Sequence, residues 1–181
     1  MQMTINGYVA GPNGENDWMT WNPDAEFMAF LSSLLDTSDT LLLGRKTAEG
    51  IIKYWEDTAV ENPTHPFAKK IADLPKVVFT KTLDKSTWNN TTLAKGNLAK
   101  DIANLKKQSG KDIIVFGGAG FVSSLIKEGL IDEYHLIINP TAMGNGMTIF
   151  NSLDSIQKFT PIQSKLYSGG KTVLSYKPKN D

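Results

Sequence analysis

Residues 113–140 read IIVFGGAGFVSSLIKEGLIDEYHLIINP. The apolar run at residues 113–116 predicts a buried strand, and the glycines that follow it predict a tight turn. Residues 121–127 then predict a helix, and residues 134–138 predict a second strand that ends at Pro140. This alternation of strand and helix is typical of an α/β fold.

The rest of the chain continues the same alternation. A short first strand is expected to end near Ala10, before a loop over residues 11–21. Asn22-Pro23-Asp24 predicts a helix start in which Asn22 is the capping residue. Further strands are expected at residues 40–43, 76–80 and 91–94, and further helices at residues 46–55, 67–74 and 98–108. Residues 162–167 and 172–176 flank Ser168-Gly169-Gly170, which predicts a C-terminal antiparallel hairpin.

The composition predicts a single globular domain over residues 1–181 and excludes several kinds of site. Basic and acidic residues balance at 19 each, so there is no basic excess to attract nucleic acid or an anionic membrane. Without cysteine the chain forms no disulfide, thiol nucleophile or iron–sulfur site. The two histidines lie far apart in sequence, so we expect no metal site. No signal-peptide pattern is visible, and we expect a cytoplasmic protein.

Arg45 is the only arginine of the chain, and it follows the apolar run at residues 41–43 where a helix is expected to begin. A helix N-terminus already carries partial positive charge, so an anionic ligand would relieve the placement of a cation there. The planar guanidinium also suits bidentate binding of a phosphate. The alternative is a surface arginine paired with a carboxylate.

Two further segments have the same order of strand, turn and polar end. The cluster Gly117-Gly118-Ala119-Gly120 would let the backbone approach a pyrophosphate closely, although it lacks the spacing of the dinucleotide fingerprint. Thr80-Lys81-Thr82 follows an apolar strand and could hold a phosphate. The alternatives are an ordinary strand–helix turn and a solvated strand end.

Weaker features lie around the first helix and before residue 150. Glu26 and Phe30 share one helix face at a spacing of four residues, and Glu26 could bind a cationic heterocycle or be a solvated acid. Gly144 and Gly146 lie in a turn whose glycines could admit a ligand. His135 is expected to be an ordinary strand residue.

The order of TINGYVAG, DTLLLGRKT, KVVFTKTL and VFGGAGFVSSLIKEGLIDEYHLIINP resembles the dihydrofolate reductase-like superfamily. Within it, the chain is similar to the branch containing the reductase domain of the riboflavin-biosynthesis deaminase-reductase. The resemblance implies an α/β three-layer fold with a central mixed sheet flanked by helices and a C-terminal antiparallel hairpin. It also implies NADPH as the cofactor.

The resemblance assigns roles to residues of this chain. It implies a cofactor site formed by Gly44, Arg45, Lys46, Thr47, Thr80, Lys81, Thr82, Gly117, Gly118, Ala119 and Gly120. It implies that Glu26 is the catalytic acid lining the pocket beside the nicotinamide, with Trp21 and Phe30 as substrate contacts. Gly144 and Gly146 complete the expected substrate-binding set.

The activity expected from this resemblance is hydride transfer from NADPH to an unsaturated carbon or imine in a small heterocycle or its sugar chain, as in 5-amino-6-(5-phosphoribosylamino)uracil reductase. The alternatives are a dihydrofolate or pterin reductase, a non-catalytic NADP-binding module, and a flavin-utilising protein. We also expect a homodimer that pairs through a sheet edge and the C-terminal strands, with residues 134–138 and 173–176 as its surface. A cis peptide is expected between Gly117 and Gly118, the alternative being a trans turn with glycine at positive φ.

Overall fold

A computed structural model describes residues 1–179, which form two compact units. The first unit combines Met1–Met28 with the chain from Ala119 onward, and the second unit is Ala29–Gly118. Helix α1 (Ala25–Asp36) begins in the first unit and ends in the second. The expectation of a single domain over residues 1–181 stays a prediction.

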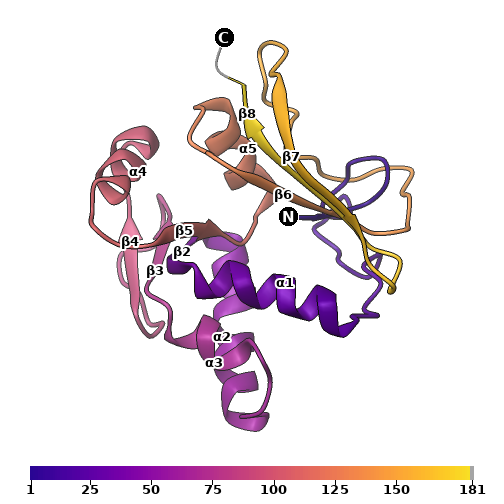
Figure 1. Ribbon diagram of the computed structural model, residues 1–181. Helices are drawn as coiled ribbons and strands as arrows, with labels where there is room; N and C mark the ends of the chain where they lie inside the picture. The colour runs from indigo at the N-terminus through magenta and orange to yellow at the C-terminus, as the bar shows by residue number, and fades with distance from the viewer. Residues whose placement is uncertain (180–181) are drawn as a thin grey trace. The chain divides into compact units, whose positions relative to one another are not determined.

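The second unit is built on a four-stranded sheet in which every pair of neighbouring strands is parallel (Figure 1). The strand order is β4 (Thr91–Ala94), β3 (Lys76–Phe79), β2 (Ser38–Gly44) and β5 (Asp112–Val115). Leu41, Leu43 and Val78 have no exposed surface, because strands of a parallel sheet carry apolar side chains on both faces. All four strands were predicted at or close to these positions.

Three helices connect or follow these strands, namely α2 (Arg45–Glu61), α3 (Ala68–Asp73) and α4 (Leu98–Lys106). Asn97 caps α4 by accepting a hydrogen bond from the Lys100 N–H. Helix α2 runs six residues beyond the predicted end at Trp55, as its polar last turns gave no apolar periodicity to follow. Burial lowers the pKa of Lys76, whose Nζ donates to the carbonyl oxygens of Ala72 and Leu74 at the end of α3.

The first unit contains a mixed sheet of order β1 (Gln2–Met3), β6 (Tyr134–Ile138), β8 (Thr172–Pro178) and β7 (Phe159–Leu166). β1 pairs with β6 in parallel, whereas β8 pairs with β6 and β7 in antiparallel fashion. β7 and β8 form the C-terminal hairpin that was predicted (Figure 1). Helix α5 (Ala119–Lys127) also belongs to this unit.

One sequence expectation about strand positions is wrong in this unit. The first strand lies at Gln2–Met3, and near Ala10 there is only an isolated bridge to Met147. β6 and β8 are inner strands of this sheet, although β1 covers only Ile137 and Ile138 of β6, and the expected dimer surface at residues 134–138 and 173–176 stays a prediction. The open edge at the hairpin end of this sheet is β7.

Asp24, rather than the predicted Asn22, caps the start of α1. Its carboxylate accepts a hydrogen bond of 2.7 Å from the Phe27 N–H and two more from Ser168 Oγ and the Gly169 N–H at the hairpin tip. These bonds, with that from Phe27 first, lower the pKa of Asp24 to about 2. Asp24 therefore joins the start of α1 to the hairpin, which a local capping pattern does not reveal.

Lys171 directly follows the turn of the same hairpin and is almost fully buried. Its Nζ donates to the Thr20 carbonyl oxygen and lies 5.8 Å from the centre of the Phe27 ring. Burial lowers the pKa of Lys171.

No helix within residues 1–179 is long and apolar enough to cross a membrane.

Candidate functional site

The parallel sheet of the second unit brings three predicted cofactor-binding segments to one edge. Gly44 is paired with Phe79, and Leu42 is paired with Val115. Because β3, β2 and β5 run in the same direction, the residues that follow each strand leave the sheet on the same side. This carboxyl edge therefore carries Gly44, Arg45, Lys46 and Thr47, then Thr80, Lys81 and Thr82, and finally Gly117 and Gly118.

Arg45 is the first residue of α2 and forms an ion pair of 2.6 Å with Glu49. The structure thus shows the carboxylate pairing that was the alternative interpretation of Arg45. The pair has the less favourable direction for a helix, since the cation lies nearer the N-terminus than the acid. Gly44 provides no side-chain cap, and the first turn of α2 has no acidic residue. The helix start is therefore left with free N–H groups beside a cation.

Thr80 shapes the turn after β3. It is buried, and its Oγ1 accepts hydrogen bonds of 3.1 Å from the N–H groups of Thr82 and Leu83. Lys81 and Thr82 are exposed on this turn. The hydroxyl–lysine–hydroxyl sequence thus folds as a tight turn in which Thr80 is structural and Lys81 is open to a ligand.

The turn after β5 contradicts one expectation. The described residues contain no cis peptide bond, so the bond between Gly117 and Gly118 is trans. The two glycines have φ values of +83° and +76°. Two consecutive residues in the left-handed region redirect the chain from strand to helix without a cis bond, and glycine adopts this region without steric cost.

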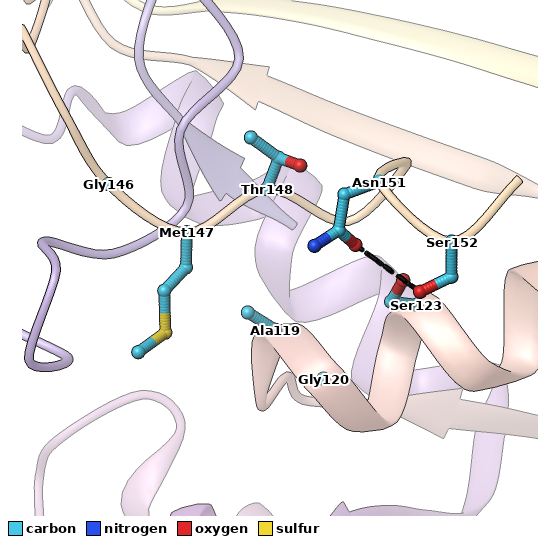
Figure 2. Close-up of a pocket in the computed structure, with 8 residues that line it drawn as sticks. All are labelled: Ala119, Gly120, Ser123, Gly146, Met147, Thr148, Asn151 and Ser152. Carbon is cyan, nitrogen blue, oxygen red and sulfur yellow. Dashed lines mark hydrogen bonds between the residues drawn. The ribbon is translucent and has the colours of Figure 1, made fainter.

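The first unit contains a cavity of about 440 Å³ between the start of α5 and the loop before β7 (Figure 2). Three predicted site residues line it, namely Ala119, Gly120 and Gly146. Five residues that the sequence did not single out complete the lining: Ser123, Met147, Thr148, Asn151 and Ser152. Asn151 and Ser152 form a short polar run after residues 148–150, and such a run is typical of an ordinary loop.

The loop at Gly146 is fixed against the N-terminal segment. The Val9 N–H donates to the Met147 carbonyl oxygen and the Met147 N–H donates to the Ala10 carbonyl oxygen, both at 2.8 Å. A Cβ at Gly146 would lie 2.5 Å from that Ala10 oxygen, so only glycine fits without movement. A Cβ at Gly144 would meet nothing within 4 Å, and Gly144 does not line the cavity.

The predicted site residues in and just before the first helix do not line this cavity. Glu26 pairs with Lys165 of β7 at 2.5 Å, and its side chain is 64% exposed. The hydrogen bond to Glu26 raises the pKa of Lys165. Trp21 is 62% exposed, and Phe30 is half-buried. The roles of Glu26, Trp21 and Phe30 stay predictions.

Other ionisable groups show structural pairing. His135 lies on β6, as expected of a strand residue, with its Nδ1 2.9 Å from Ser175 Oγ. Within residues 1–179 there is no group of three or more histidine, aspartate or glutamate side chains that could hold a metal ion.

The chain is similar to known proteins over nearly its whole length. YyaP of Bacillus subtilis, an uncharacterised protein, is 29% identical over 176 residues, which are 97% of this chain and 91% of YyaP. A structure of a candidate riboflavin biosynthesis protein from Shewanella sp. PV-4 superposes with a TM-score of 0.76 at 24% identity, covering 99% of this chain and 97% of that one.

A structure from Thermotoga maritima superposes with a TM-score of 0.69 at 14% identity, covering 98% of this chain and 55% of that one. It is named as a diaminohydroxyphosphoribosylaminopyrimidine deaminase and 5-amino-6-(5-phosphoribosylamino)uracil reductase. These superpositions confirm the dihydrofolate reductase-like α/β fold that the resemblance implied. Residues 1–173 match the RibD C-terminal domain family, and the chain belongs to that family.

Proposed function

We propose that the protein is an NADPH-dependent reductase that transfers a hydride to a small heterocyclic substrate. The observation that carries the proposal is the carboxyl edge of the parallel sheet, where the helix start at Arg45, the turn at Lys81 and the glycine turn after β5 leave on one side. Family membership supports an oxidoreductase, and the edge supplies the groups that a dinucleotide phosphate requires.

The donor set at this edge fits NADPH. Arg45 and Lys46 lie in the uncapped first turn of α2, and Lys81 follows the neighbouring strand. The guanidinium can bind two phosphate oxygens at once, and lysine adds a point charge. When bound, NADPH supplies the hydride. The work of the protein is then to hold the phosphates, to position the ring and to exclude water.

The substrate part of the proposal rests on the fold relatives and on the cavity of the first unit. Two structural relatives are named as a uracil reductase and as a pyrimidine reductase-like protein, the latter from Corynebacterium diphtheriae. The cavity combines Met147 and Ala119 with hydroxyl and amide groups, as expected for a small polar ring. A homodimer and a cytoplasmic location are further expectations of this proposal.

The test is oxidation of NADPH by the purified protein with ribosylaminopyrimidines, dihydrofolate or flavins as acceptor. We expect oxidation with a ribosylaminopyrimidine and its loss in the Arg45→Ala variant at low NADPH concentration. Faster oxidation with dihydrofolate would favour the pterin alternative. NADPH binding without oxidation of any acceptor would favour a non-catalytic module, and a yellow purified protein would indicate a bound flavin.

A further inference from the structure

The Asn151 side chain is held in one orientation at the wall of the cavity. Its Oδ1 lies 2.9 Å from the Ser123 hydroxyl and 3.4 Å from the Ser152 hydroxyl, and both hydroxyls donate to it. The two serine oxygens are themselves 2.8 Å apart. Ser123 is almost fully buried on α5, so it is a fixed partner. The acceptor end of the amide is therefore occupied by the protein.

The donor end of the same amide faces the cavity. Figure 2 shows Asn151 Nδ2 pointing toward the side lined by Ala119 and Met147, away from Ser152. Along residues 1–179 no hydrogen bond from Nδ2 to another group is formed. An amide nitrogen carries two N–H donors. Asn151 therefore offers donors to whatever enters the cavity.

The cavity is rich in donors but has no ionised side chain. None of its eight lining residues is lysine, arginine, histidine, aspartate or glutamate. Ala119 and Gly120 add backbone N–H groups of the first turn of α5, which have no partner within the helix. Donors without a net charge match a neutral acceptor such as a carbonyl oxygen.

We propose that Asn151 is a ligand-binding residue that donates its amide N–H groups to the carbonyl oxygen of an uncharged ring or carboxamide. The inference rests on the proposed function in that the ligand is either the heterocyclic substrate or the nicotinamide end of the cofactor. Ser123 and Ser152 act as positioning residues, since they hold the amide with its donors outward. By fixing the amide in this way, the two serines make the cavity favour ligands with a hydrogen-bond acceptor over ligands with a donor.

The test follows the Asn151 side-chain amide by NMR in ¹⁵N-labelled protein, with its signal assigned from the Asn151→Ala variant. Uracil and nicotinamide are the probes, and pyrimidine and 3-methylpyridine are matched compounds without a carbonyl group. We expect uracil or nicotinamide to shift the Asn151 amide signals and the matched compounds to leave them in place. A uracil response identifies the substrate side, and a nicotinamide response identifies the cofactor side.

The variants give the size of the effect. Asn151→Ala should weaken the responding probe about two- to tenfold, the range of one neutral hydrogen bond. Asn151→Asp should weaken it by more than about tenfold, because a carboxylate repels the carbonyl oxygen. Asn145→Asp is the matched control, because it adds the same charge in the same loop. The Gly146 N–H donates to Asn145 Oδ1, and an aspartate at this position keeps an oxygen that can accept this bond. Ser123→Ala should cause a smaller loss, because the amide is then less firmly oriented.

Three results would overturn the proposal: no shift of the Asn151 amide with either probe, equal shifts with the matched compounds, or equal losses in Asn151→Asp and Asn145→Asp. The readout needs no turnover. A protein that shows the shifts but oxidises no NADPH would contradict the reductase proposal and leave the role of Asn151 intact.

Discussion

Arg45→Ala removes the only arginine of the chain from the carboxyl edge of the parallel sheet, and we expect it to weaken NADPH more than NADH. A hydrogen bond to a charged group contributes about 1.5–3 kcal/mol. Arg45 must first leave Glu49, and a pair at this helix spacing is worth about 0.3–0.5 kcal/mol. The net loss is about 1–2.7 kcal/mol, which is roughly fivefold to a hundredfold in the dissociation constant.

The assay is titration of the protein with each reduced cofactor, followed by the fluorescence of the nicotinamide. Two variants of the same helix serve as controls. Glu49→Gln frees Arg45 and should tighten NADPH about twofold. Lys53→Ala removes a cation that forms a similar pair with Asp57 further along α2, and NADPH should bind it as it binds the wild type. Equal losses for NADPH and NADH in Arg45→Ala would remove Arg45 from the phosphate role.

Four other predictions follow from the first unit. Gly146→Ala should lower the melting temperature by roughly 3–10 °C, because its Cβ would press on the Ala10 carbonyl oxygen, whereas Gly144→Ala should melt like the wild type. Asp24→Ala should lower the urea midpoint of unfolding at pH 7. Because folding lowers the pKa of Asp24 to about 2, the difference between the midpoints of wild type and variant should persist down to about pH 4 and disappear toward pH 2. A difference that stays constant over this range would contradict the role of Asp24. Because folding lowers the pKa of Lys171, the unfolded chain binds the Lys171 proton more tightly than the folded chain does. The stability of the wild type should therefore rise at alkaline pH up to the ordinary lysine pKa of about 10.4. Lys171→Met should reduce this rise, and a variant with the same pH profile as the wild type would contradict the prediction. Light scattering at micromolar concentration should give the mass of a dimer, and a monomer mass would exclude the expected assembly.

Much of the fold was predictable because its strands are apolar and short. The strands at Thr91–Ala94 and Tyr134–Ile138 have the predicted bounds, and the hairpin was visible from Ser168-Gly169-Gly170. What the sequence could not show is long-range polar bonding. Two of the three groups that donate hydrogen bonds to the Asp24 carboxylate belong to Ser168 and Gly169, far along the chain.

The site was predictable where backbone geometry requires it and not where side chains cooperate. The glycines after residue 116 and the helix start at Arg45 follow from strand–turn–helix physics, and the parallel sheet brings them to one edge. The cis bond was the wrong choice between two backbone solutions that the same glycine pair permits. Asn151 gave no signal, because its significance depends on Ser123, which lies 28 residues away on a helix.

We propose that this chain moves a hydride from NADPH to a small heterocyclic substrate. The most direct test uses NADPH that carries deuterium on the reducing carbon of its nicotinamide, with a ribosylaminopyrimidine as acceptor and mass spectrometry of the product. We expect a product one deuterium heavier with the wild-type protein, and a much lower yield with Arg45→Ala at low NADPH concentration. A reduced product without deuterium, or no reduced product while NADPH remains bound, would contradict it.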